Sequence, residues 1–130
     1  MVLDTSAVLA ILFNEPEAAA IETAIEADSV RLMSTASALE AAIVVEARYG
    51  EPGGRELDLL MHKARIDLVS FDLAQVELAR LAYRRFGKGR HPAGLNFGDC
   101  FAYALSRRSG EPLLFTGDDF SRTDIAVAQV

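Results

Sequence analysis

The sequence predicts an α/β fold built around a mainly parallel β-sheet. Short apolar segments alternate with segments of helical periodicity along the whole chain, and this order is typical of parallel strands joined by right-handed crossovers. Isolated carboxylates lie near the ends of predicted strands or early in the helices that follow them. Because the carboxyl ends of parallel strands meet at one edge of an open sheet, where ligands commonly bind, these acids are expected to converge there.

The N-terminal part of the chain predicts a strand followed by helical structure. We expect residues 1–4 to form a buried strand, with a helix directly after it that Thr5 or Ser6 is suited to cap. Pro16 suits the first turn of a helix, which is expected to continue to about Asp28.

A second strand and two further helices are expected next. Residues 30–33 predict a strand, and Ser34 or Thr35 is suited to cap a helix that stops at Gly50. Residues 52–54, Pro-Gly-Gly, are interpreted as a break in the chain's regular structure. The next helix has an apolar face that belongs to the core or to an interface, and we favour the core. This face carries Leu57, Leu60, Met61 and Ala64.

The C-terminal half continues the alternation. Residues 66–71 predict a third strand, and Asp72 is suited to cap the helix after it. A loop rich in glycine and basic residues follows at 87–95. The remaining expected elements are a helix that Asn96 caps and that runs through Ser109, a buried strand over 112–116 and a last strand over 125–130.

Length and composition indicate a soluble globular protein. The 130 residues suffice for one domain with a substantial core, so we expect residues 1–130 to form a single domain. Hydrophobic residues make up 51% and charged residues 25%, as in ordinary soluble proteins. The apolar run Val8–Phe13 is too short to span a bilayer, and the N-terminus lacks the basic region of a signal peptide. We therefore expect a cytoplasmic protein without membrane contact.

The single cysteine and the two histidines do not indicate thiol or zinc chemistry. Cys100 follows Asp99 rather than a base that would stabilise a thiolate, so we interpret it as a small buried hydrophobe. His62 and His91 lack the spacing of metal ligands, which disfavours a zinc site.

Asp4 and Glu40 are acids at positions where the local pattern calls for apolar or neutral residues. Asp4 ends the first predicted strand, where it acts either as a metal ligand or as a helix cap. Because Thr5 and Ser6 could cap that helix equally well, we favour the metal ligand. Glu40 has small or apolar helical neighbours, so it is expected on a buried face, where an unpaired carboxylate is costly. A cation, an arginine or access to solvent would relieve that cost.

Three more acids lie in the C-terminal third. Asp99 is in the first turn of its predicted helix, where a carboxylate also complements the helix dipole by about 0.3–1 kcal/mol. Asp118 and Asp119 follow a buried strand and a glycine, as in an ordinary acidic turn. Thr116, at the end of that strand, either orients water at a metal or terminates the strand.

Taken together, the acids indicate a metal site. Like charges that are brought together repel, so such a cluster usually requires a divalent cation. Carboxylates without a catalytic His or Cys suit oxygen-preferring ions, and we therefore expect Mg²⁺ or Mn²⁺.

Four segments carry a family resemblance. They are Val-Leu-Asp-Thr-Ser-Ala at 2–7, Ser-Ala-Leu-Glu at 37–40, Asn-Phe-Gly-Asp-Cys-Phe-Ala-Tyr-Ala at 96–104 and Leu-Leu-Phe-Thr-Gly-Asp-Asp-Phe at 113–120. Together they resemble a PIN domain, and in particular the VapC-type toxins of bacterial and archaeal toxin–antitoxin pairs. The resemblance covers essentially the whole chain and implies a small three-layer α/β/α sandwich that cleaves RNA.

The resemblance also implies a set of catalytic acids. They are Asp4, Glu40 and Asp99, with a fourth at Asp118 or Asp119, of which Asp119 is slightly favoured. The predicted metal ligands are Asp4, Asp99 and Glu40, with Asp118 as a further candidate. Activated water would attack the phosphodiester in line and leave a 5′-phosphate and a 3′-hydroxyl.

Further expectations concern supporting residues and partners. Thr116 and Ser6 would support the acids. The resemblance implies a cognate VapB-like antitoxin that lays its C-terminal segment over the acidic pocket. It also implies a homodimer or a hetero-oligomer with that antitoxin, and a structured RNA substrate, whether tRNA, rRNA or mRNA.

Basic residues are concentrated in one block of an otherwise acidic chain. The net charge of −6 argues against general nucleic-acid binding. The block nevertheless offers phosphate contacts, which position RNA without reading its sequence; alternatively, it complements the C-terminal dipole of its helix. The candidate RNA-binding residues are Arg84, Arg85, Lys88 and Arg90.

Two other functions are compatible with part of the pattern. A haloacid-dehalogenase-type phosphohydrolase also has Asp after its first strand, but it needs a second Asp where this chain has Ser6. A non-catalytic interaction module would keep the fold and use its acids structurally. The full set of acids argues against that module.

Overall fold

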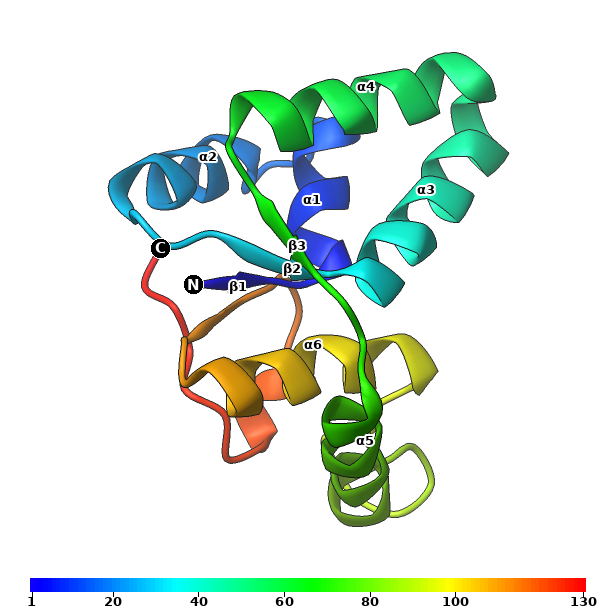
Figure 1. The fold of residues 1–130 in the computed structure, drawn as a ribbon, viewed down its shortest axis with the longest axis vertical. Helices are drawn as coiled ribbons and strands as arrows, with labels where there is room; N and C mark the ends of the chain where they lie inside the picture. Colours follow the sequence, from blue (N-terminus) through cyan, green and yellow to red (C-terminus); the bar gives the residue numbers. More distant parts are fainter.

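The computed structural model describes residues 1–130, which form a four-stranded parallel sheet with helices on both faces (Figure 1). The strands are arranged in the order β3-β2-β1-β4. The elements in chain order are β1 (Val2–Leu3), α1 (Thr5–Leu12), α2 (Ala18–Ala27), β2 (Leu32–Ser34), α3 (Thr35–Tyr49), α4 (Glu51–Lys63), β3 (Asp67–Val69), α5 (Leu73–Phe86), α6 (Phe97–Ser109), β4 (Leu113–Leu114) and the 3₁₀ helix η1 (Phe120–Arg122).

The sheet separates two helical layers. Helices α1 to α4 lie on one face, whereas α5, α6 and η1 lie on the other (Figure 1). Side chains alternate between these layers along each strand, as expected for extended backbone. Leu3, Met33 and Leu114 pack in the core beneath α1 to α4, while Val2 and Leu113 pack against α5 and α6. The predicted three-layer α/β/α sandwich is confirmed.

The strand order places a switch point beside β1. The chain adds β2 and then β3 on one side of β1 and returns to add β4 on the other side. In open parallel sheets such a reversal opens a crevice at the carboxyl ends of the strands. Asp4 follows β1, and residues 115–119 follow β4, so both segments border that crevice.

The predicted break at 52–54 is wrong, because these residues lie in the first turns of α4. Proline is tolerated there because its missing N–H would have no helical partner. A Cβ at Gly53 would lie 2.9 Å from the carbonyl oxygen of Val45, so glycine allows α3 and α4 to approach closely. Leu57 is buried and Leu60 packs against the same core, which confirms the core assignment of this face.

The N-terminal helices also differ in detail from the prediction. Asp4, rather than Thr5 or Ser6, caps α1. Pro16 precedes the first turn of α2 instead of lying in it, since α2 has Glu17 at its N-cap position.

None of the helices combines the length and apolar composition that a membrane span requires.

The expected last strand over 125–130 is reduced to a single bridge. The Leu113 N–H donates to the carbonyl oxygen of Ala126, and the Ala128 N–H donates to that of Leu113, each at 2.9 Å. These bonds form one parallel bridge between Leu113 and Val127. Because β4 is itself only two residues long, its neighbour has little backbone to pair with.

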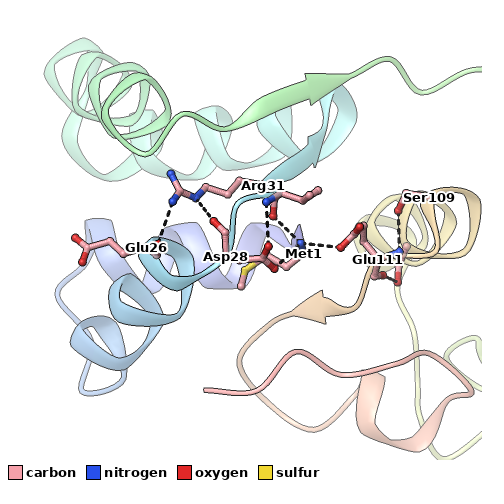
Figure 2. A network of polar contacts seen from close by, with 8 residues as sticks. Met1, Glu26, Asp28, Arg31, Ser109 and Glu111 are labelled. Atoms are coloured by element: carbon pink, nitrogen blue, oxygen red, sulfur yellow. Dashed lines mark hydrogen bonds and ion pairs between the residues drawn. The ribbon is translucent and has the colours of Figure 1, made fainter.

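A polar network holds the start of β1 (Figure 2). The Met1 ammonium donates to Asp28 Oδ2 at 2.9 Å, to Glu111 Oε2 at 3.1 Å and to the Val30 carbonyl oxygen at 2.6 Å. Arg31 donates from its guanidinium to carbonyl oxygens at the C-terminal ends of α2 and α4. The network therefore joins the start of β1 to the segments that lead into β2 and β4.

Candidate active site

Asp4 lies at the carboxyl end of β1 and is almost fully buried, with 4% of its surface exposed. Its Oδ2 accepts hydrogen bonds from the Ser6 N–H at 3.0 Å and from the Ser6 hydroxyl at 2.6 Å. These bonds are those of a helix N-cap. Its other oxygen, Oδ1, accepts no hydrogen bond from the protein, so capping leaves one oxygen available to a ligand.

Ser6 connects Asp4 to the end of β4. While its hydroxyl donates to Asp4, its oxygen accepts a hydrogen bond from the Thr116 N–H at 3.0 Å. The predicted supporting residues Ser6 and Thr116 are therefore in contact with each other. Thr116 takes part through its backbone, which fixes the end of β4 relative to the carboxylate of Asp4.

Asp99 occupies the first turn of α6 and forms a reciprocal capping box with Asn96. The Asp99 N–H donates to Asn96 Oδ1 at 3.0 Å, and the Asn96 N–H donates to Asp99 Oδ2 at 2.9 Å. The predicted cap at Asn96 is confirmed. Asp99 Oδ1 accepts no hydrogen bond from the protein, so this acid, like Asp4, keeps one free oxygen.

Glu40 lies on α3, whose start is tied to the start of α1 because the Thr5 hydroxyl donates to the Ser37 carbonyl oxygen at 3.1 Å. The expected buried face around Glu40 is wrong. Glu40 is half-buried, and Ile43, one turn further on, is 60% exposed. The buried stripe of α3 consists of Ser37, Ala41 and Val45. Glu40 lies at its margin, and its carboxylate makes no ion pair and accepts no hydrogen bond.

The Glu40 carboxylate packs against Gly98, the second residue of α6. A Cβ at this position would lie 2.7 Å from both Glu40 Cδ and Oε1, and still closer to Oε2. Gly98 is a part of the site that is not among the residues predicted from the sequence. Its available signal was a glycine inside a helical segment, where alanine is more favourable locally.

Asp118 and Asp119 are both exposed in the turn before η1. The Asp118 carbonyl oxygen accepts a hydrogen bond from the Ser121 hydroxyl. The charge of Asp119 acts on Asp99 and raises its pKa, but that of Asp118 has no such effect. The structure thus groups Asp119 with the other acids.

Burial is the main cause of the abnormal pKa values in this group. Burial raises the pKa of Asp4 to about 7; the Ser6 hydrogen bonds oppose this rise, and the charges of Asp99 and Glu40 add to it. Burial likewise raises the pKa of Asp99 to about 6, opposed by the backbone hydrogen bond from Asn96 and supported by the charges of Asp119 and Glu40. Asp4, Glu40, Asp99 and Asp119 therefore interact electrostatically across four separate segments of the chain.

The donor set fits a hard divalent cation. Asp4 and Asp99 each present a free carboxylate oxygen, Glu40 presents two, and no lysine or arginine pairs with them. A cation would relieve the cost of holding these charges together. No three acidic, histidine or cysteine side chains are grouped closely enough to hold an ion as they stand, so binding requires at least one of the acids to move.

Cys100 is buried beside this group and donates from its thiol to the Asn96 carbonyl oxygen at 3.3 Å. Burial, with a further contribution from the charge of Asp99, raises the pKa of this thiol to about 11. A thiol with such a pKa stays protonated at neutral pH, so the interpretation of Cys100 as a small buried hydrophobe is confirmed.

Of the four candidate RNA-binding residues, one forms an ion pair and three do not. Arg85 Nη1 lies 3.2 Å from Asp124 Oδ2, and the same carboxylate accepts a hydrogen bond from the Tyr103 hydroxyl. Three exposed basic residues form no ion pair: Arg84, Lys88 and Arg90.

Lys88 and Arg90 lie in the loop over 87–95, which leads into the start of α6, whereas Arg84 lies in α5. The Lys88 N–H donates to the Leu95 carbonyl oxygen at 2.8 Å, immediately before the Asn96 cap. On the other side, Arg122 Nη1 of η1 lies 3.4 Å from the Pro92 carbonyl oxygen. The loop is thus held between the start of α6 and the segment that follows Asp119.

Residues 1–126 match the family model of the PIN domain. The chain belongs to the PIN-domain family. It is 63% identical over 126 residues to the ribonuclease VapC30 of Mycobacterium tuberculosis, which covers 97% of this chain and 96% of that protein. It is equally similar to a ribonuclease VapC of Mycolicibacterium smegmatis, over 97% of this chain and 98% of the relative. Membership of this family excludes the haloacid-dehalogenase alternative.

Solved structures share the fold at low sequence identity. VapC20 of Mycobacterium tuberculosis, described as a sarcin–ricin loop cleaving toxin, has a TM-score of 0.78 at 15% identity and covers 96% of this chain and 95% of its own. VapBC2 of Rickettsia felis, solved with a DNA fragment from its promoter, has a TM-score of 0.72 at 13% identity, over 98% and 96% of the two chains. At such identities the likeness supports the fold alone.

Proposed function

We propose that this PIN-domain protein is a metal-dependent endoribonuclease that acts as the toxin of a toxin–antitoxin pair. The observation that carries the proposal is the electrostatic coupling of Asp4, Glu40, Asp99 and Asp119 at the carboxyl edge of the sheet. The chain's 63% identity to proteins named VapC ribonucleases supports RNA as the substrate.

Asp4 and Asp99 are the residues best suited to hold Mg²⁺ or Mn²⁺. Each has one oxygen engaged in a helix cap and the other free, and the cap restrains the rotation of the carboxylate. When bound, the ion lowers the pKa of water and neutralises charge on the scissile phosphate.

Glu40 is the candidate for proton transfer and for orienting the attacking water. Its carboxylate has no protein hydrogen-bond partner, and the residue is only half-buried, so water can reach it. Its charge acts on both Asp4 and Asp99. Asp119 completes the acidic set, while Ser6 and the Thr116 backbone hold Asp4 in place.

RNA is positioned beside the acids by the exposed basic loop. Lys88 and Arg90 of this loop and Arg84 of α5 have no ion-pair partners, and the hydrogen bond between Lys88 and Leu95 closes the loop immediately before the cap of α6. Phosphate contacts of this kind fix the position of the RNA rather than its sequence.

An antitoxin is the expected partner at the apolar surface beside Glu40. Leu39, Ile43 and Phe97 are each at least 60% exposed and border a groove next to this acid. Exposed apolar patches of this kind mark protein interaction sites. We propose that a VapB-like antitoxin covers the patch and the acids, and that the toxin also pairs with a second copy of itself.

The proposal is tested by cleavage of a panel of structured RNAs with Mg²⁺ or Mn²⁺. We expect the wild type to cut at defined sites and Asp4→Asn to lose at least about a hundredfold in rate, because an amide is a poor metal ligand. Asp58→Asn, which removes an exposed carboxylate on α4, is the matched control and is expected to cut normally. Equal cutting by all three proteins would contradict the assignment of the site.

A further inference from the structure

We propose that Gly98 is a positioning residue, whose missing side chain creates the space in which the Glu40 carboxylate lies at the start of α6. The inference rests on the proposed function, since it concerns an acid of the same site. It adds a residue that contacts neither substrate nor metal and acts through Glu40.

The space at Gly98 is already filled by Glu40. A Cβ at this position would lie 2.7 Å from Glu40 Cδ, and contacts below 3.0 Å are essentially never made by real Cβ atoms. Gly98 is buried and lies in the first turn of α6, whose capping box restrains the backbone. Any side chain at 98 must therefore displace the Glu40 carboxylate.

No ion pair or hydrogen bond in the protein holds that carboxylate. Glu40 makes no ion pair and accepts no hydrogen bond, so packing against the Gly98 backbone is the restraint that the structure provides. The N-terminal turn of a helix also attracts a negative charge through its unpaired N–H groups and its dipole. Close approach at Gly98 places Glu40 at this end of α6, beside Asp99.

Local helix energetics do not explain the glycine. Glycine inside a helix costs roughly 0.5–1 kcal/mol relative to alanine, and Gly98 does not have a positive φ that would require it. The contact with Glu40 is the feature of this position that alanine cannot reproduce.

The test combines three variants with two readouts. Gly98→Ala is expected to lower RNA cleavage and Mn²⁺ affinity by about 10- to 100-fold, as disturbing the residues around a metal site typically does. Glu40→Gln is expected to lower cleavage at least as much. Mn²⁺ affinity is measured without RNA, from the electron paramagnetic resonance signal of free Mn²⁺, so that it is independent of activity.

The third variant tests whether Gly98 acts through Glu40. Glu40→Asp removes one methylene and makes room for a Cβ at 98. We therefore expect Gly98→Ala/Glu40→Asp to bind Mn²⁺ and cleave RNA better than Gly98→Ala alone. A purely structural defect at 98 would not be relieved by shortening Glu40.

Gly54→Ala is a matched control. Gly54 also lies near the start of a helix, α4, and a Cβ there would lie 3.0 Å from the Cδ of Glu46. Glu46 is exposed and its charge acts on none of the site's acids, so the control places a similar but milder steric demand on a glutamate outside the site. It is expected to leave cleavage and Mn²⁺ binding unchanged.

Each outcome bears on a specific part of the proposal. Wild-type Mn²⁺ binding and cleavage by Gly98→Ala, with Glu40→Gln inactive, would overturn the role of Gly98 and leave the proposed function intact. Wild-type cleavage by Glu40→Gln would overturn the role of Glu40, and this inference with it. If Gly98→Ala unfolds, the double variant decides: recovery of its fold and Mn²⁺ binding supports the contact with Glu40, and continued unfolding contradicts it.

Discussion

Asp4 and Asp99 each use one carboxylate oxygen to cap a helix and keep the other free. Capping therefore does not exclude ligand binding, because one carboxylate has an oxygen for each role. The cap determines where the free oxygen points, and burial makes its charge costly until a cation arrives. The hydrogen bonds to the capping oxygen of such a residue stabilise the fold, whereas the buried negative charge of the ionised carboxylate destabilises it.

Because the cap stabilises the fold and the buried charge destabilises it, Asp4→Asn is predicted to be more stable than the wild type, by an amount that depends on pH. The pKa of Asp4 is raised from 3.8 to about 7, so its favourable contribution is present below pH 4 and is lost as the pH rises towards 7. We expect the variant to match the wild type near pH 3.5 and to be more stable at pH 8, by up to about 4 kcal/mol at roughly 1.4 kcal/mol per pKa unit. Asparagine retains the cap.

The measurement is thermal unfolding in EDTA from pH 3.5 to 8, with Asp58→Asn as the control on an exposed carboxylate. A loss of stability at pH 8 that is equal to the loss at pH 3.5 would show that Asp4 serves the fold only as a cap.

At the scale of the elements, the start of α6 is where the site is assembled. It carries Asp99, receives the Glu40 carboxylate of α3 at Gly98, and adjoins the loop over 87–95. The backbone hydrogen bond of Lys88 fixes this loop at the same helix end. The exposed side chains of Lys88 and Arg90 thus belong to a loop that leads directly into the helix that carries Asp99.

The loop is predicted to contribute to RNA affinity. We expect Lys88→Ala/Arg90→Ala to weaken RNA binding and to reduce the slope of log affinity against log salt by about 0.7 for each phosphate that the variant no longer neutralises. Binding is measured with Asp4→Asn in every variant, so that the RNA stays intact. Arg107→Ala/Arg108→Ala, which removes two exposed charges at the opposite end of α6, is expected to leave the slope unchanged.

An unchanged slope in the loop variant would place the RNA path elsewhere. Arg85→Ala is expected to behave differently from the loop variants, because Arg85 pairs with Asp124 and holds the segment after η1 to α5. Its main effect should be on stability.

At the scale of the whole molecule, a small sheet depends on contacts at its edges. Strands β1 and β4 are each two residues long, so few ladder hydrogen bonds hold them. The ammonium of Met1, a residue whose side chain is 5% exposed, adds charged contacts to Asp28 and Glu111. These contacts join the start of β1 to the segments that precede β2 and β4 (Figure 2).

Glu111→Gln is accordingly expected to lower the free energy of unfolding by about 1 kcal/mol, since it weakens a charged hydrogen bond to a buried group. Urea unfolding at neutral pH measures the effect. Glu77→Gln is the control, because Glu77 pairs with Arg80 at 3.6 Å with both side chains more than 60% exposed, and such surface pairs contribute little. Equal effects of the two substitutions would contradict a structural role for the Met1 network.

Features of the fold that depend on residues close together in the chain could be predicted from the sequence. Alternating apolar segments predicted the parallel sheet, and the capping residues Ser34, Asp72 and Asn96 all cap helices in the structure. The positions of Asp4 and Asp99 after strand and cap signals indicated one shared edge. These predictions succeeded because a strand or a helix cap is specified by residues that lie only a few positions apart in the chain.

Contacts between side chains that are far apart in the chain could not be predicted from the sequence and are seen only in the folded structure. Asp118 and Asp119 have nearly the same neighbours in sequence, yet only the charge of Asp119 acts on Asp99. Arg85 is paired by Asp124, 39 residues away, and the space at Gly98 matters because Glu40 of another helix fills it. Each of these facts depends on the packing of segments that are far apart in the chain, and local propensities carry no information about such packing.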